Sequence, residues 1–297
     1  MTNNQLLNKM KNDMKMRNFS HYTYDSYLGK TKDIMRYFKE KRLEEVTTEE
    51  LRIYLLKYLK DERKLSDSSI NYYNSVIRFI YEVTLDKVIN KKQLPMRKKK
   101  KTVYKVLTKE ELSTFFNVCD NFKFKTIFML VYGSGLRIGE VVNLRVEDID
   151  SEKMRLFVRE GKGNKERYTI LPEKSLEMLR TYWSRYRQNK RRGRIFLSER
   201  GDAITVGVIR EHFREYRRKA KLNEKVTVHT LRHCFATDLI ERGATIIQVK
   251  ELMGHSNIRS TMEYVHVANI KLDLESPLDE FLKGEKKKNG KDSRNIK

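Results

Sequence analysis

Residues 229–264 read HTLRHCFATDLIERGATIIQVKELMGHSNIRSTMEY, and this stretch decides the fold of the second half of the chain. Apolar side chains recur in it at intervals of three and four residues, which predicts helices over residues 230–242, 245–253 and 256–267. Gly243 and Gly254 follow the first two helices, where a helix commonly ends on a glycine. The predicted buried stripe of the first helix consists of Leu231, Phe235, Leu239 and Ile240.

The region before this stretch mixes helices with strands. Thr108 and the glutamates that follow it mark a helix start. Residues 154–159 and 166–171 flank the sequence EGKGNK, which is typical of a β-hairpin with a tip rich in glycine and asparagine. Further helices are predicted over residues 172–188 and 206–220. We therefore expect an α+β fold in which residues 107–283 form a mainly helical domain with a small antiparallel sheet.

The first half of the chain has the pattern of a separate helical module. Residues 20–86 contain one glycine, no proline and three or four amphipathic helical patterns. Residues 1–94 are expected to form this domain, followed by a basic linker at 95–106, while residues 284–297 are expected to be a basic, disordered tail. The consecutive linker cations expected to lie along phosphates are Arg97, Lys98, Lys99, Lys100 and Lys101.

Composition narrows the partner and the compartment. The 297 residues include 64 Lys and Arg against 40 Asp and Glu, a formal net charge of +24, which indicates a polyanionic partner. The basic residues are spread along the chain instead of gathering on one amphipathic helix, so nucleic acid is favoured over a membrane surface. Cys119 and Cys234 are too few for a disulfide framework, and with no signal or membrane-spanning segment the expected location is the cytoplasm, at the nucleoid.

Four separated motifs carry the chemistry. They are GSGLRIGE at residues 133–140, GKGNKER at 161–167, HTLRH at 229–233, and GHS at 254–256 with a tyrosine nine residues after its histidine. In this order and spacing they resemble the tyrosine recombinase, or integrase, family. The resemblance implies a nucleophile, Tyr264, and an active site that contains Arg137, Lys162, His229, Arg232 and His255. It also implies that Glu140 orients a catalytic arginine, and that residues 1–94 are a SAM-like, four-helix module that binds core DNA.

Phosphodiester transfer asks for these residue types on physical grounds. Guanidinium groups such as those of Arg137 and Arg232 offer paired donors to the oxygens that gain charge in the transition state. A free tyrosine is only about 0.1% ionised at pH 7, an obstacle of roughly 4 kcal/mol, so His229 and His255 are candidates to help remove its proton. Lys162 can protonate the leaving 5′-oxygen. Because a phosphotyrosine keeps the energy of the broken bond, no metal, ATP or other cofactor is expected.

The resemblance further implies site-specific recombination of double-stranded DNA through a 3′-phosphotyrosine and a Holliday junction. A homotetramer would act on two paired sites, alone or together with a related recombinase. The length near 300 residues favours a Xer-like or integron-like enzyme, and we favour integration, excision or resolution for a mobile genetic element. Two other functions remain open at this point: a type IB-like topoisomerase, and a DNA-binding protein without catalysis on the same scaffold.

Several of these residues also have simpler interpretations. Arg137 and Glu140 could form a surface ion pair, and Lys165 is as consistent with solvation as with a phosphate contact. His229 and His233 have the i,i+4 spacing of zinc ligands, but position 230 is threonine where such a site needs glutamate. His233 and Cys234 are therefore expected to pack or to support the site rather than to bind metal.

Overall fold

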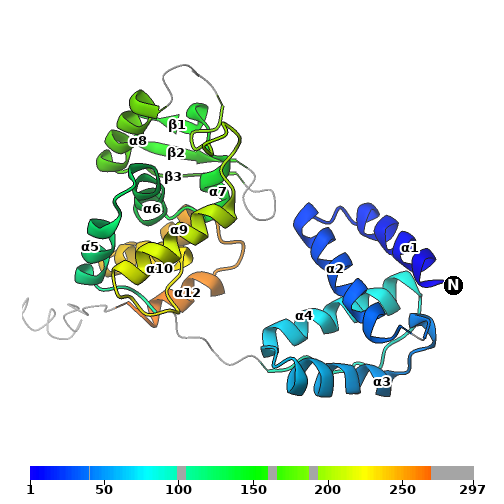
Figure 1. Cartoon of the computed structure of the whole chain (residues 1–297). Helices are drawn as coiled ribbons and strands as arrows, with labels where there is room; N and C mark the ends of the chain where they lie inside the picture. The colour runs from blue at the N-terminus through cyan, green and yellow to red at the C-terminus, as the bar shows by residue number, and fades with distance from the viewer. Residues whose placement is uncertain (40, 99–104, 160–165, 187–192, 269–297) are drawn as a thin grey trace, which may run out of the picture. The chain divides into compact units, whose positions relative to one another are not determined.

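A computed structural model of the chain describes residues 1–39, 41–98, 105–159, 166–186 and 193–268 (Figure 1). The chain divides into two compact units, Met1–Thr102 and Val103–Lys297. The second unit combines helices with a small antiparallel sheet, whereas the described part of the first is helical, in agreement with the predicted α+β class. Each unit is described by itself below.

The N-terminal unit is built from helices that bury one apolar face each. Its core includes Met10, Ile34, Tyr54 and Ile77, all almost fully buried. The helix α3 continues directly into the π-helical turns of η2, and α4 continues into those of η3. The elements are α1 (Asn3–Met16), α2 (His21–Tyr37), η1 (Leu43–Glu45), α3 (Thr48–Ile53), η2 (Tyr54–Glu62), α4 (Asp67–Arg78) and η3 (Phe79–Thr84).

The helix α1 was not among the helices expected from the sequence. A capping box between Thr2 and Gln5 starts it, and it buries Leu6, Met10 and Met14, which lie four residues apart. The remaining positions are mostly polar, so its apolar stripe is too narrow to stand out from sequence alone. The other helical segments of this unit agree with the three or four predicted over residues 20–86.

Side chains on one face of α4 hold the chain where it leaves the N-terminal unit. The Asn71 amide donates to the Arg97 carbonyl at 2.9 Å and accepts from the Arg97 amide at 2.8 Å. Asn74 donates to the carbonyls of Leu94 and Pro95, and Arg78 also donates to that of Leu94. We call residues 94–97 the strap. Because the strap is tied to α4 at every residue except Met96, residues 95–97 of the expected linker lie against the N-terminal unit.

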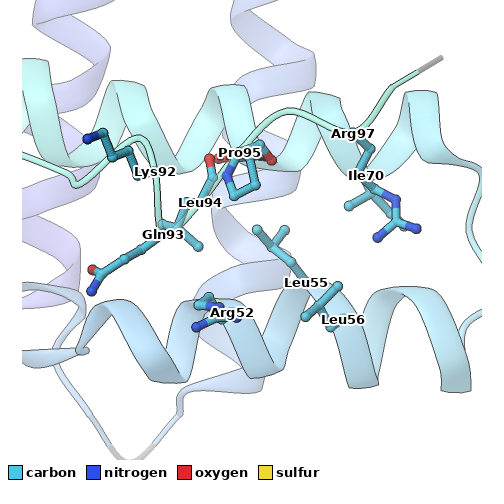
Figure 2. A pocket seen from close by; sticks show the side chains of 10 residues that line it. Arg52, Leu55, Leu56, Ile70, Lys92, Gln93, Leu94, Pro95 and Arg97 are labelled. Atoms are coloured by element: carbon cyan, nitrogen blue, oxygen red, sulfur yellow. Dashed lines mark hydrogen bonds between the residues drawn. The ribbon is translucent and has the colours of Figure 1, made fainter.

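The strap also covers one side of a cavity of about 290 Å³. Figure 2 shows Leu55 and Leu56 of η2 on the side that faces Pro95, with Arg97 at one end. The Arg97 guanidinium does not lie free, because its Nε donates to Asp67 at 2.6 Å. Leu94, the first residue of the strap, is buried and adds an apolar contact to these polar ones.

The second unit places a three-stranded antiparallel sheet beside its helices, with the order β1-β2-β3 in the described residues. The central helix of the unit, α6, packs against α8, α10 and β3 (Figure 1). The elements are α5 (Lys109–Val118), α6 (Phe122–Ser134), α7 (Ile138–Asn143), η4 (Val146–Asp148), β1 (Ile149–Asp150), β2 (Arg155–Val158), β3 (Arg167–Ile170), α8 (Glu173–Tyr186), α9 (Val206–Lys219), α10 (Val228–Glu241), α11 (Ile246–Met253) and α12 (Arg259–Val265).

The predicted hairpin is present as β2 and β3, which pair from Arg155 with Ile170 to Val158 with Arg167. Leu156 and Val158 on β2 are buried in the core, whereas Tyr168 and Ile170 on β3 are exposed. The sheet is therefore half-buried, with one face against the core. β1 adds a short third strand that the sequence did not predict. The tip at 160–165 lies outside the described residues.

The helix α10 is surrounded by protein over most of its length. Every residue from Thr230 to Thr237 is buried, and the helix packs against α6, α11 and α12. Cys234 accepts a hydrogen bond from the Leu107 amide, and both cysteines are free and buried, as expected. No helix within the described ranges is both long and apolar enough to cross a membrane.

The strap generates a testable prediction. Asn71→Ala removes the side-chain partner of the half-buried amide and carbonyl of Arg97, which should lower the free energy of unfolding by about 1 kcal/mol. Release of the strap should also expose the peptide bond after Arg97, so limited trypsin digestion should cut there faster. The matched control is Ser68→Ala, an exposed serine on the same helix. Equal digestion rates for wild type and Asn71→Ala would show that the strap does not depend on Asn71.

Candidate active site

Arg232 lies at the centre of the site and is fully buried on α10. Its guanidinium donates to the backbone carbonyls of Gly135 and Met253, which follow or end α6 and α11. The Nε of Arg232 has no hydrogen-bond partner among the described residues. A buried guanidinium with an unused donor is fixed in place and still able to bind an anion.

Glu140, on α7, ties the arginines of the site together. Its carboxylate accepts two hydrogen bonds from the Arg167 guanidinium, at 2.9 and 2.8 Å, and one from that of Arg137 at 2.8 Å. Arg232 lies 3.7 Å from the same carboxylate. Burial alone would raise the pKa of Glu140, but the hydrogen bonds and charges of Arg167 and Arg137 outweigh it and hold that pKa at about 2.

Arg137 stands at the rim of this cluster, immediately before α7. Its side chain is 23% exposed, unlike that of Arg232, and it donates to the Gly254 carbonyl at 3.1 Å. The main-chain amide of Arg137 also donates to Glu140, at 2.7 Å. The ion pair between Arg137 and Glu140 is thus part of a buried network and not the surface pair that was the simpler interpretation.

Arg167 had no role in the sequence analysis, although it ends the motif at 161–167. It begins β3, pairs with Glu140 through two hydrogen bonds, and donates through Nε to the Leu252 carbonyl at 2.8 Å. Gly254 has a left-handed backbone (φ +61°), and a Cβ there would lie 2.8 Å from the Arg167 Cδ. The place of Arg167 at the end of that motif, at the start of a predicted strand, was the signal that could have identified it.

His255 lies between Arg232 and the tyrosine. Its Nε2 is 3.4 Å from an Arg232 nitrogen, and its Nδ1 is 3.0 Å from the hydroxyl of Thr261. Because Arg232 can only donate, Nε2 accepts and Nδ1 carries the proton. Partial burial and then the charges of Arg232 and Arg137 lower the pKa of His255 to about 3, so the ring is neutral at physiological pH.

Tyr264, on α12, is 3% exposed and lies next to these histidines. Its ring stacks against that of His255, with 6.1 Å between centroids. Its hydroxyl is 3.0 Å from Nδ1 of His233, a residue that the sequence analysis assigned to packing or support. His229 is exposed, and its ring meets the edge of His233 at 4.5 Å between centroids.

The structure therefore gathers most of the predicted site residues of this unit. Arg137, Glu140, His229, Arg232, His255 and Tyr264 come from α7, α10, α12 and the segments that flank them. Lys162, Lys165, Lys99, Lys100 and Lys101 lie outside the described residues. Among the residues that are described, no three His, Cys, Asp or Glu side chains are grouped so that they could hold a metal ion.

This arrangement can bind a phosphate and attack it. Arg137 and Arg232 present fixed positive charge, and only one nearby carboxylate, Glu140, is in contact with them in the described part of the chain. The ring of Tyr264 stacks on His255, which contacts Arg232, and its hydroxyl contacts His233. Anion-stabilising donors beside a nucleophile are what a group transfer at phosphorus requires.

Comparison with known proteins agrees with this geometry. Residues 105–270 match the phage integrase family, and residues 6–91 match the phage integrase N-terminal SAM-like domain. A Sinorhizobium fredii protein named as an integrase/recombinase, y4qK, is 34% identical over 93% of this chain and 89% of its own length. Tyrosine recombinase XerA of Pyrococcus horikoshii is 36% identical, over 82% of this chain and 87% of its own.

The fold is also that of a solved structure, a lambda integrase tetramer bound to a Holliday junction. The TM-score is 0.72 at 18% identity, and the match covers 93% of this chain and 80% of that one. This likeness shows the fold, and the family matches favour recombination over the topoisomerase and non-catalytic alternatives. The chain belongs to the phage integrase family and is a tyrosine recombinase, an enzyme of site-specific DNA recombination.

Proposed function

We propose that Tyr264 attacks a DNA phosphate held by Arg137 and Arg232, and that the product is a 3′-phosphotyrosine and a free 5′-hydroxyl. The observation that carries this proposal is a series of contacts. The buried Arg232 guanidinium lies beside the His255 ring, and the Tyr264 ring stacks on that histidine. His229 lies at the exposed side of the same group and is positioned to meet the DNA backbone.

Lys162 completes the proposed chemistry as the general acid for the leaving 5′-oxygen. The hairpin strands that end at Val158 and start at Arg167 belong to the same unit as the arginines, and Arg167 itself contacts Glu140. Lys162 lies between these two strands in the sequence. A short stretch of chain therefore joins it to Arg167, which contacts the same glutamate as Arg137. With protein groups supplying both acid and anion stabilisation, we expect the reaction to need neither metal nor ATP.

The DNA-binding roles of the basic segments are proposed on charge. Lys165 and the linker cations Lys98, Lys99, Lys100 and Lys101 would contact phosphates, and Arg97 would do so through the face that Asp67 leaves open. Residues 1–94 would form the core-DNA-binding domain and residues 107–283 the catalytic domain, with 95–106 between them. Binding should weaken steeply with salt: the slope of log K against the logarithm of the salt concentration should be about −0.9 per contacted phosphate.

For the assembly, we propose a homotetramer on two paired sites in double-stranded DNA, alone or with a related recombinase. The likeness to a lambda integrase tetramer on a Holliday junction supports this, as does the family itself. We further propose that the enzyme acts in the cytoplasm, at the nucleoid, on the ends of a mobile genetic element. Strand exchange between two sites, in place of relaxation of a single supercoiled circle, separates this function from a topoisomerase.

Replacing the nucleophile tests the central assignment. Tyr264→Phe should bind DNA like the wild type but form no covalent adduct with a nicked suicide substrate in EDTA, because the attacking oxygen is gone. The adduct is measured on denaturing gels and located by peptide mapping. Tyr168→Phe, which removes the hydroxyl of an exposed tyrosine, is the control and should cleave normally. An adduct formed by Tyr264→Phe at wild-type yield would exclude Tyr264 as the nucleophile.

Arg137→Ala tests the proposed phosphate-binding pair, Arg137 and Arg232. Arg137 is the more exposed of the two, so its loss should disturb the fold less. Loss of one transition-state donor should slow single-turnover cleavage by about 100-fold at saturating DNA. Arg180→Ala, an exposed arginine on α8, should leave the rate unchanged. If Arg137→Ala cleaves at the control rate, Arg137 does not stabilise the transition state.

Glu140→Gln tests, by acid unfolding, whether the Glu140 carboxylate stabilises the cluster of arginines. The folded pKa of Glu140, about 2, lies below the ordinary value of 4.5, so its contribution to stability is present above that value and lost as pH falls towards 2. The variant should be less stable than wild type at neutral pH, and the difference should shrink between about pH 4.5 and 2. Glu177→Gln, an exposed residue paired with Lys174, should show no such convergence. A constant difference at all pH values would contradict the assignment.

A further inference from the structure

The hydroxyl of Tyr264 has a close partner that the family motif does not assign. Nδ1 of His233 is 3.0 Å from it, and the two rings lie 5.4 Å apart between centroids. Both side chains are buried, and they come from α10 and α12, which pack directly on each other. The contact is therefore fixed by the packing of two helices rather than by a surface rotamer.

The other histidines are less well placed to receive the tyrosine proton. His255 uses Nε2 to accept from Arg232 and Nδ1 to donate to Thr261, so both of its ring nitrogens are engaged. His229 presents its ring to the edge of His233 and is exposed. Within the described residues, the histidine nitrogen in hydrogen-bonding contact with the Tyr264 oxygen is Nδ1 of His233, at 3.0 Å.

We propose that His233 is a catalytic residue, the general base that takes the Tyr264 proton during cleavage; this rests on the proposed role of Tyr264 as nucleophile. The bond from the tyrosine oxygen to phosphorus forms while the bond from phosphorus to the 5′-oxygen breaks. The phenolic proton passes to His233 Nδ1, and the leaving oxygen takes a proton from the proposed acid, Lys162. In rejoining, the attacking 5′-hydroxyl gives its proton back to Lys162 and protonated His233 returns its proton to Tyr264, so the cycle needs no other reactant.

The groups that face His233 keep it neutral before DNA binds. They are His229 and Arg232 on its own helix, His255 after α11, and Tyr264 on α12. Burial, followed by the electrostatic effects of His229, Arg232 and His255, lowers the pKa of His233 to about 3. A bound phosphate brings negative charge to Arg232 and so acts in the opposite direction. His233 therefore gains basicity when the substrate is in place, which couples proton removal to DNA binding.

The experiment compares two substitutions at this position. His233→Gln keeps a hydrogen-bond acceptor for the tyrosine but cannot take its proton, and His233→Ala leaves space for imidazole. Single-turnover adduct formation is measured on the suicide substrate from about pH 5.5 to 9.5. His233→Gln should be slower by about 100-fold at neutral pH, and its rate should keep rising with pH because solvent must remove the proton. Added imidazole should accelerate His233→Ala but not His233→Gln.

Controls separate this role from packing. His212→Gln changes a histidine on α9 that stacks on Phe124, and it should cleave like the wild type. If His233→Gln cleaves at the wild-type rate, His233 is not the base. If it is slow but has the wild-type pH profile and His233→Ala gains nothing from imidazole, the contact is structural and the proposal is equally overturned. A wild type that forms no adduct at Tyr264 would instead overturn the proposed function on which this inference rests.

A second measurement does not depend on the folding of a His233 variant. In wild type and in Tyr264→Phe, the ¹⁵N chemical shift of His233 Nδ1 reports whether that nitrogen accepts a hydrogen bond. Removal of the hydroxyl should move the shift towards that of a free, unprotonated nitrogen. An identical shift in the two proteins would show that Tyr264 does not donate to His233, and the proposal would fail.

Discussion

The carboxylate of Glu140 is the interaction on which the rest of the catalytic unit depends. It collects the guanidinium groups of Arg137, Arg167 and Arg232, which come from three different elements of the chain. Burying like charges so close together would be costly without it, because each one disfavours its neighbours. One negative charge against three positive ones leaves the group with a net positive charge. In the proposed reaction, a DNA phosphate held by Arg137 and Arg232 would reduce this net positive charge by one.

A single helix delivers most of the remaining chemistry. On α10, His229, Arg232 and His233 occupy positions i, i+3 and i+4, which places them on one face. That face meets α12, whose Tyr264 is packed as tightly as a core side chain. The tyrosine is thus positioned by hydrophobic packing as much as by hydrogen bonds. Apolar neighbours such as Val249 and Met253 belong to the same buried cluster as Tyr264 and pack around it.

The sequence predicted an element well where the periodicity of its apolar residues is clear. The helices after Pro172 and the hairpin strands agree with their predicted ranges within a few residues, because their apolar periods are clear and glycines such as Gly254 end them. Helix α1 was missed because only three of its residues are buried. The contacts of Arg167 and of His233 could not be foreseen, since both depend on which element packs against which. Motif spacing along the chain indicates which residues share a site, but not which atoms touch.

The strap has a consequence for building chimaeric recombinases by exchanging N-terminal modules. A junction placed at Pro95, where proline and the first cations suggest that the linker begins, would separate α4 from the native residues Pro95 and Arg97, whose backbone groups its side chains bind. The transplanted module would then carry unpaired amides on α4 and an open apolar cavity. A junction placed after Arg97 keeps the module, its strap and its last anchoring contact in one piece.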